Sequence, residues 1–151
     1  TQAMTAQQFE VRGYIPSPQG SKKHVGNGIM VEVSPTVKLW RSAVADAAVL
    51  ARIKKITGPV IAHMEFVFPR PASHFGTGKN STKLKPQSPK RGHSVRPDLS
   101  KLVRSTEDAL SGIAYEDDAR IVRFSHLEKR YANGDELPGA IIKLWAANNY
   151  G

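Results

Sequence analysis

Three aspartates and a serine lie where the sequence predicts turns beside a helix. Asp98 and Ser100 belong to the stretch RPDLSKL, and Asp117 and Asp118 belong to the stretch EDDARIV. In an extended segment, residues two apart point the same way, so positions 98 and 100 can face one point before the helix begins. Carboxylates that converge from two loop ends bind hard cations such as Mg²⁺ or Mn²⁺. The structural alternative makes Asp98 a helix N-cap and the aspartate pair turn residues.

The charge of the chain predicts an anionic partner. The 151 residues include 22 Lys and Arg against 13 Asp and Glu, which gives a net charge of +9. Such an excess favours nucleic acid or an anionic membrane face. The best helical pattern, residues 35–52, is rich in Ala and Val and poor in cations, so it lacks the basic face of a membrane-binding helix. We therefore favour nucleic acid and expect no membrane association.

Cysteine is absent, which excludes disulfide bonds and cysteine-ligated zinc and is typical of a protein of the reducing cytoplasm. No stretch approaches the run of about 18 apolar residues that a transmembrane helix needs. The N-terminal residues also lack a basic segment followed by an apolar run, the pattern of a secretion signal. We therefore expect a soluble, cytoplasmic protein.

Hydrophobic spacing predicts an α+β fold for residues 1–151, as a single domain with one mixed sheet of about five strands and two helices. Asn27-Gly28 favours a hairpin turn between the first two strands, and Ser34-Pro35 is typical of a helix start. Trp40 leads a stripe at helical spacing that we expect in the core. In chain order, the expected elements are strands at 9–15 and 29–33, a helix at 35–52, a strand at 59–70, a helix at 98–111, and strands at 119–132 and 140–146.

Both faces of the strand at 59–70 carry apolar residues, which predicts a central strand covered on both sides. His63 and Glu65 are two apart and so share one face of that strand. They are either metal ligands or a polar pair with ordinary hydrogen bonds. We favour the polar pair, which is the commoner role of such residues on a strand.

Residues 71–97, the basic loop, contain Pro, Gly, Ser and Lys without an apolar period. Loops longer than about 15 residues in a compact domain are usually functional or disordered. Acidic residues are absent between positions 70 and 96, and the cations there are Arg70, Lys79, Lys83, Lys85, Lys90, Arg91 and Arg96. We expect an arm that grips phosphates and becomes ordered on binding. Further expected phosphate contacts are Lys22 and Lys23 in the first hairpin and Lys129 on a strand.

The stretch FPRPASHFGTGKN, residues 68–80, precedes RPDLSKLVRSTEDALSGIAYEDDARIV, residues 96–122. This order resembles the RusA family of Holliday junction resolvases, in particular its bacteriophage and prophage branch. The family pattern has Pro-Asp-Leu-Asp-Lys-Leu, a helix ending in Asp-Ala-Leu-Thr/Ser-Gly, and an Asp-Asp pair that opens a strand. The resemblance spans residues 64–131. It implies a homodimeric, Mg²⁺-dependent endonuclease, with Mn²⁺ as a substitute, that cuts four-way DNA junctions by paired incisions.

The resemblance also implies roles for individual residues. Asp98 matches the first motif aspartate and Asp118 matches the second residue of the Asp-Asp pair, and both bind metal and act in catalysis in the family. Asp117 matches the neighbour in that pair and is a further candidate metal ligand. Lys101 follows the phage pattern, and Arg104 stands where other members carry a lysine needed for cleavage. Either cation can steady the scissile phosphate or the leaving oxygen.

Ser100 stands at the family's second motif aspartate, so the sequence departs from the pattern at a metal position. A serine hydroxyl is neutral and binds metal more weakly than a carboxylate. Three accounts are open: an engineered inactivating substitution, a natural variant that has lost cleavage, or a site where water or Asp117 replaces the ligand. The intact pattern around Ser100 favours the first. We expect a junction resolvase impaired in cleavage; the alternatives are a non-catalytic DNA-binding protein and a nuclease for other branched DNA.

Overall fold

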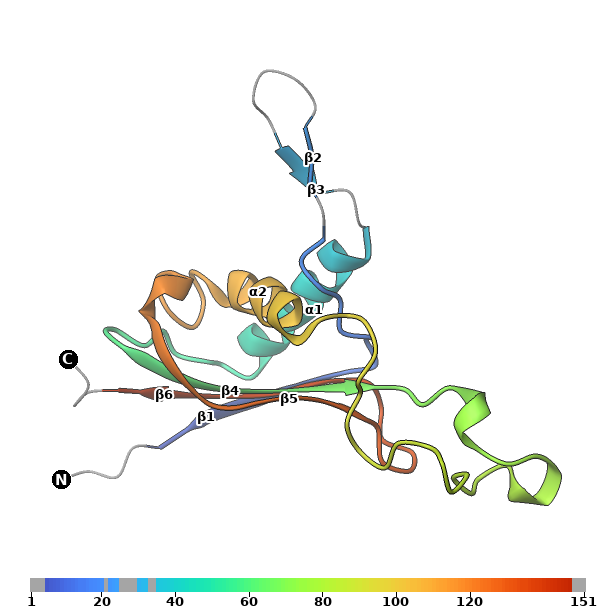
Figure 1. The fold of residues 1–151 in the computed structure, drawn as a ribbon. Helices are drawn as coiled ribbons and strands as arrows, with labels where there is room; N and C mark the ends of the chain where they lie inside the picture. The colour runs from blue at the N-terminus through green and yellow to red at the C-terminus, as the bar shows by residue number, and fades with distance from the viewer. Residues whose placement is uncertain (1–4, 21, 25–29, 33–34, 148–151) are drawn as a thin grey trace.

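The computed structural model describes residues 5–20, 22–24, 30–32 and 35–147. In this part of the chain, one four-stranded sheet carries two helices on one face (Figure 1). The main elements are β1 (Gln7–Arg12), α1 (Pro35–Leu50), β4 (Val60–Phe68), α2 (Leu99–Leu110), β5 (Ile121–Tyr131) and β6 (Gly139–Ala146). The strand order is β1-β6-β4-β5, with β4 and β5 parallel and the other pairs antiparallel. The predicted α+β class with a mixed sheet and two helices is confirmed.

The predicted hairpin between the first two strands is wrong, and the sheet has four strands where about five were expected. β1 pairs with β6, so that Phe9 and Val11 are buried in the core of the domain. The short strands β2 (Lys22–His24) and β3 (Met30–Glu32) pair only with each other and project beyond α1 (Figure 1). The predicted turn at positions 27 and 28 and the predicted helix cap at position 34 lie outside the described residues.

The core lies between the sheet and the two helices. Trp40 on α1 is 1% exposed, which confirms its predicted place in the core. Its indole N–H donates to the Thr106 hydroxyl of α2 at 3.1 Å, so a hydrogen bond joins the helices where they cover β4. β4 is a central strand, as predicted, because it pairs with both β5 and β6. None of the described helices is long and apolar enough to cross a membrane.

The other face of the sheet, here called the open face, carries none of the described helices (Figure 1). β4 is nevertheless largely buried on both faces, as expected, because Ile61 and Val67 on the open face are 8% and 0% exposed. Polar side chains from all four strands lie on this face, and they include Arg12, Glu65, Glu128 and Lys143. A network of ion pairs takes the place of a second apolar layer.

The basic loop leaves β4, runs beyond the sheet edge and returns to α2 (Figure 1). Its returning half is anchored to the sheet, because the His93 ring stacks on Phe68 at 4.0 Å between centroids. The backbone N–H of His93 donates to the carbonyl oxygen of Lys129 at 3.1 Å, and the N–H of Tyr131 donates to the carbonyl oxygen of Arg91 at 2.8 Å. The loop stem is held by the protein itself, which differs from the expectation of an arm ordered only by binding.

Candidate active site and basic surface

Asp98 is the exposed residue at which the basic loop becomes α2. It occupies the N-cap position with an extended backbone, as the structural alternative predicted, yet its side chain makes no capping hydrogen bond. The Lys101 ammonium lies 4.0 Å from its carboxylate. Because both groups are more than half exposed, this ion pair contributes little to stability. The Asp98 carboxylate is therefore available to a ligand.

Ser100 is an exposed residue of the first turn of α2, since that helix begins at Leu99. The prediction that positions 98 and 100 share an extended segment is therefore wrong. Residues two apart on a helix do not face each other. Lys101 and Arg104 are exposed on the same helix, three residues apart, so they lie on one side of it.

Asp117 and Asp118 lie at the start of the 3₁₀ turn η3 (Asp118–Arg120), which leads into β5. The Asp117 carboxylate accepts a hydrogen bond from the Ala119 N–H at 2.9 Å and so caps this turn. Asp118 is partly buried, and its carboxylate makes no hydrogen bond within the described residues. Asp117 thus has the structural role that the turn alternative predicted, whereas Asp118 keeps its oxygens free.

Glu107 on α2 is a neighbour of Asp118 that the sequence analysis missed. Burial is the main cause that raises the pKa of Glu107 to about 7, and the charges of Asp118 and Asp108 raise it further. The same three carboxylates, together with burial, raise the pKa of the Tyr115 hydroxyl, which donates to the Glu107 carbonyl at 2.8 Å. Position 107 lies at the edge of the apolar stripe of α2, four residues after Val103. This four-residue spacing from a buried residue was the sequence signal that Glu107 lies partly against the core.

Asp98 precedes the first turn of α2, whereas the charge of Asp118 acts on Glu107 in the last turn of that helix. Asp118 acts on Glu107, which is nine residues beyond Asp98 on one helix, so about 13 Å of helix axis separates the two ends. Within the described ranges, the one group of three or more candidate ligands with atoms within 4.8 Å of one another contains neither aspartate. Its members are His63, Glu65 and His126 on the open face. In the described residues, neither Asp98 nor Asp118 belongs to a close group of three candidate ligands, so their convergence stays a prediction.

Some of the predicted phosphate contacts instead hold the basic loop on the sheet. The Arg70 guanidinium donates to two loop carbonyls at 2.5 and 2.8 Å and lies 4.9 Å from the centroid of the Tyr131 ring. The Lys129 ammonium donates to two further loop carbonyls at 2.5 and 2.6 Å. Arg91 pairs with Glu128, and one of its nitrogens donates to that carboxylate at 2.8 Å. These three cations are structural in this conformation.

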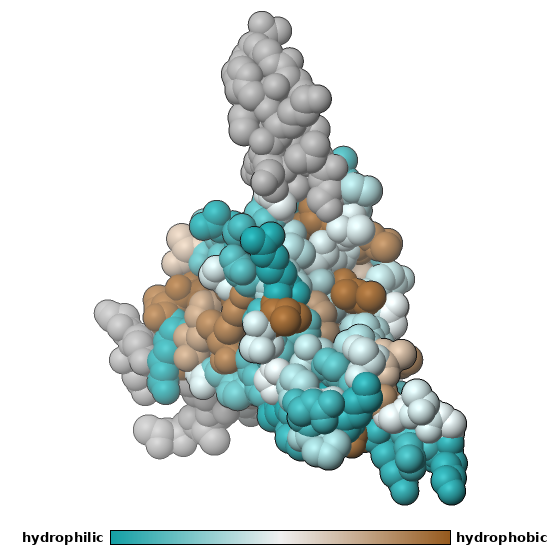
Figure 2. Space-filling view, turned by 45° about the vertical axis from the view of Figure 1, so that its right-hand side comes forward, coloured by the Kyte–Doolittle hydropathy of each residue, from teal (hydrophilic) through white to brown (hydrophobic). Residues whose placement is uncertain are grey.

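The remaining cations of the loop are free to meet phosphates. Lys79, Lys83 and Arg96 are exposed, and none has a side-chain hydrogen bond or ion pair within the described chain. Lys85 is half-buried, and Lys90 makes only long contacts of 3.4 and 3.5 Å with carbonyls. The space-filling view shows that the surface formed by the loop is largely hydrophilic (Figure 2). The side chains of positions 22 and 23 lie outside the described residues.

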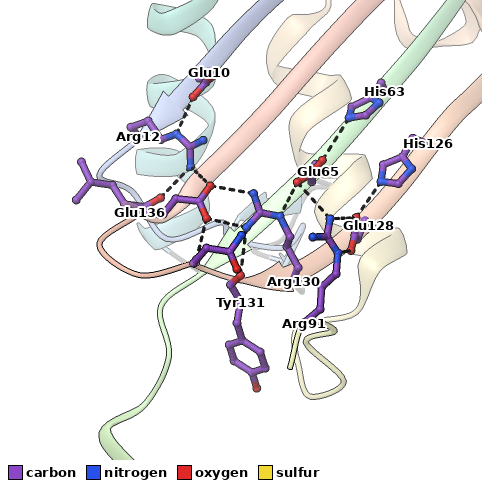
Figure 3. A network of polar contacts seen from close by, with 12 residues as sticks. Glu10, Arg12, His63, Glu65, Arg91, His126, Glu128, Arg130, Tyr131 and Glu136 are labelled. Carbon is purple, nitrogen blue, oxygen red and sulfur yellow. Dashed lines mark hydrogen bonds and ion pairs between the residues drawn. The ribbon is translucent and has the colours of Figure 1, made fainter. Parts of the chain in front are cut away.

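An ion-pair network fixes the strands beneath this loop (Figure 3). Arg130 has a side chain only 5% exposed, and its guanidinium bonds to Glu65 and to both oxygens of Glu136. Arg12 on β1 pairs with Glu136 at 3.1 Å, which extends the network across the sheet. Hydrogen bonding to Arg130 lowers the pKa of Glu136 to about 2, and the bond to Arg91 lowers that of Glu128 to about 2.

The family model of the RusA endodeoxyribonuclease matches residues 13–144, a range that includes both aspartate stretches and the basic loop. The chain belongs to the RusA family. The resemblance drawn from the motif order is thus confirmed at the level of the family and of its nuclease activity. A comparison with curated proteins gives no match. The matched range begins directly after β1 and ends within β6, so it covers α1, β4, α2, β5 and most of β6.

Proposed function

We propose that this RusA-family chain is a Mg²⁺-dependent, structure-selective endonuclease that resolves four-way DNA junctions by paired incisions, and that Ser100 impairs its cleavage. The observation that carries the proposal is the Asp98 carboxylate. It is exposed, makes no capping hydrogen bond, and lies where the basic loop meets α2, near the Lys101 ammonium. We also propose a cytoplasmic location, which is the bacterial host cytoplasm if a phage or prophage encodes the chain. DNA is available there.

The donor set fits a hard cation. Asp98, Asp118 and the second oxygen of Asp117 supply carboxylate oxygens, the ligands that Mg²⁺ prefers, and Mn²⁺ can substitute. Bound Mg²⁺ supplies Lewis-acid activation of the phosphate and of a water. Lys101 and Arg104, on the exposed side of α2, hold the scissile phosphate and its leaving oxygen. Ser100 offers only a neutral hydroxyl where the family has an aspartate, so the ion is held more weakly.

A homodimer reconciles this donor set with the position of the two aspartates. About 13 Å of helix axis lies between Asp98 and Glu107, the residue of α2 whose pKa the charge of Asp118 raises, and no close group of three ligands in the described residues includes either aspartate. Two-fold symmetry lets Asp98 of each copy approach Asp118 of the other copy, which gives two equivalent sites per dimer. Two equivalent sites also suit paired incisions in opposite strands of a junction. The proposed active unit is therefore two copies of the chain.

The free cations support binding through phosphates. Lys79, Lys83 and Arg96 carry exposed charges on the loop that leads to Asp98. Contacts to phosphates are independent of base sequence and weaken steeply with salt. Selectivity for branched DNA then comes from the shape of the junction, because phosphate contacts carry no sequence information.

The test compares the chain with Ser100→Asp on a labelled four-way junction, first with Mg²⁺ and then with Mn²⁺. Ser42→Asp is the matched control, because Ser42 is exposed on α1 and the change adds the same charge elsewhere. We expect paired incisions by Ser100→Asp alone, with similar junction binding by all three proteins. Binding without cleavage by any form would favour the non-catalytic DNA-binding alternative. Equal cleavage of forks or duplexes would favour a nuclease for other branched DNA.

A further inference from the structure

Two imidazoles and a carboxylate meet on the open face, away from the aspartates. His63 on β4 is the register partner of His126 on β5, and their rings stack with centroids 4.7 Å apart. Glu65 follows two residues after His63 on the same face, and its Oε1 lies 3.5 Å from His63 Nε2. One ligand atom from each of the three residues lies within 4.8 Å of the others. Three donors are therefore gathered at one point across two strands.

The His63 ring is poised to bind a ligand. Its Nε2 is buried and has no hydrogen-bond partner, which is costly for a polar atom of a protein. Burial lowers the pKa of His63, and the charges of His126 and Lys143 lower it further. Metal ions bind imidazole through a ring nitrogen that lacks a proton and a hydrogen-bond partner. An ion at this point would satisfy the unpartnered nitrogen.

The other two donors are oriented by residues behind them (Figure 3). The Glu65 carboxylate bonds to Arg130 through Oε2, which leaves Oε1 on the side of His63. His126 Nε2 lies 2.9 Å from a Glu128 oxygen, so Nδ1 is the ring nitrogen left for another partner. Arg91 in turn holds Glu128. Supporting carboxylates and hydrogen bonds of this kind fix the rings and carboxylates that ligate metals.

We propose that His63, Glu65 and His126 bind one transition-metal ion of the Zn²⁺ class, with solvent completing its coordination. Two imidazole nitrogens and one carboxylate oxygen suit Zn²⁺ or Co²⁺, whereas Mg²⁺ takes oxygen ligands. The ion joins β4 to β5 and, through Glu128 and Arg91, stabilises the base of the basic loop. This site shares no residue with the proposed Mg²⁺ site and does not rest on the proposed nuclease function.

Nearby cations lower the affinity of this site for a metal ion. Lys143 on β6 is the register partner of His63, and Arg91 and Arg130 lie beside the two glutamates. A lysine charge roughly 8 Å from a divalent ion in a solvated site weakens its binding by about fivefold. Lys143→Gln should therefore tighten Zn²⁺ binding by about fivefold without changing any ligand. An unchanged affinity in this variant would contradict the assigned position of the ion.

The decisive experiment titrates untagged, metal-free protein with Zn²⁺ by calorimetry and with Co²⁺ by visible absorption. We expect one ion per chain, no displacement by excess Mg²⁺, and a loss of affinity of at least about tenfold in His63→Gln and His126→Gln. His74→Gln is the matched control, because His74 lies in the basic loop outside the group. Parent-like binding in His63→Gln, or no saturable binding by the parent, would overturn the proposal.

A second measurement uses only the unmodified chain, so its result does not depend on whether a variant folds. In the unmodified chain, the ring resonances of His63 and His126 should shift together on addition of one equivalent of Zn²⁺. The rings of His74 and His93, which pack around Tyr131, should stay unchanged. Equal shifts of all four rings would mean that Zn²⁺ binds without a site, and the proposal would fail. Failure of the Mg²⁺-dependent cleavage test would leave this result untouched.

Discussion

Removal of the Glu107 carboxylate by Glu107→Gln should stabilise the protein at alkaline pH. Its pKa is raised to about 7 from the ordinary value of 4.5, mainly by burial and then by Asp118 and Asp108. Between these two values the folded protein binds more protons at this position than the unfolded chain does. The free energy of unfolding therefore falls as pH rises from 4.5 to 7, and the loss is complete above 7.

The size of the effect follows from the two pKa values. Their difference corresponds to at most about 3 kcal/mol. Glu107 is partly exposed, so solvent screening reduces the expected effect to about 1–2 kcal/mol. Glu128 and Glu136, whose pKa values are near 2, titrate below this window. They are also common to parent and variant, so the difference between the two proteins isolates Glu107.

The assay is urea unfolding of the parent and of Glu107→Gln at pH 5 and pH 8. We expect the variant to exceed the parent by about 1–2 kcal/mol at pH 8 and by much less at pH 5. Asp46→Asn is the matched control, because Asp46 is an exposed carboxylate on α1 and its removal should not produce this pH-dependent gain. A variant that follows the parent at both pH values, or that is less stable at pH 8, would refute the reasoning.

Three further predictions concern the sheet and the basic loop. Arg130→Met removes the main partner of two largely buried carboxylates, which keep only Arg12 and Arg91 nearby, and should lower the free energy of unfolding, measured in urea, by about 3 kcal/mol. Gly139→Ala places a Cβ against a β1 carbonyl oxygen at a φ of +152°, so thermal melts should report a loss of more than about 2 kcal/mol. Replacement of Lys79 and Lys83 by Gln should reduce the salt dependence of junction binding by about two phosphate contacts, whereas an unchanged slope in binding isotherms would exclude these contacts.

The sequence predicted well those elements whose apolar residues recur with the period of a helix or a strand. The spacing of apolar residues located α1, α2, β4, β5 and β6 to within about two residues, and the Trp40 stripe is core. The two helices bury one face against the sheet and β4 is buried along most of its length, so their patterns record burial directly. The order of the motifs also predicted the family, because catalytic motifs fix residue types as well as their spacing.

The pairing of distant segments was not readable from these local patterns. A turn signal at positions 27 and 28 suggested a local hairpin, yet β1 pairs with β6 at the far end of the chain. The choice depends on which partner completes the sheet over the helices, and no short window contains that information. His126 was missed for the same reason, because the β4–β5 register includes irregularities that bring it opposite His63.

The basic residues of the chain have two roles, which composition alone cannot distinguish. Arg70, Arg91 and Lys129 direct their donors at carbonyls and carboxylates of the protein, whereas Lys79 and Lys83 project from the loop with no such partner. A long segment with few apolar residues cannot bury a core of its own, so its stem is held by hydrogen-bond donors from the sheet. The excess of basic residues therefore both fixes the loop and leaves further cations exposed on it.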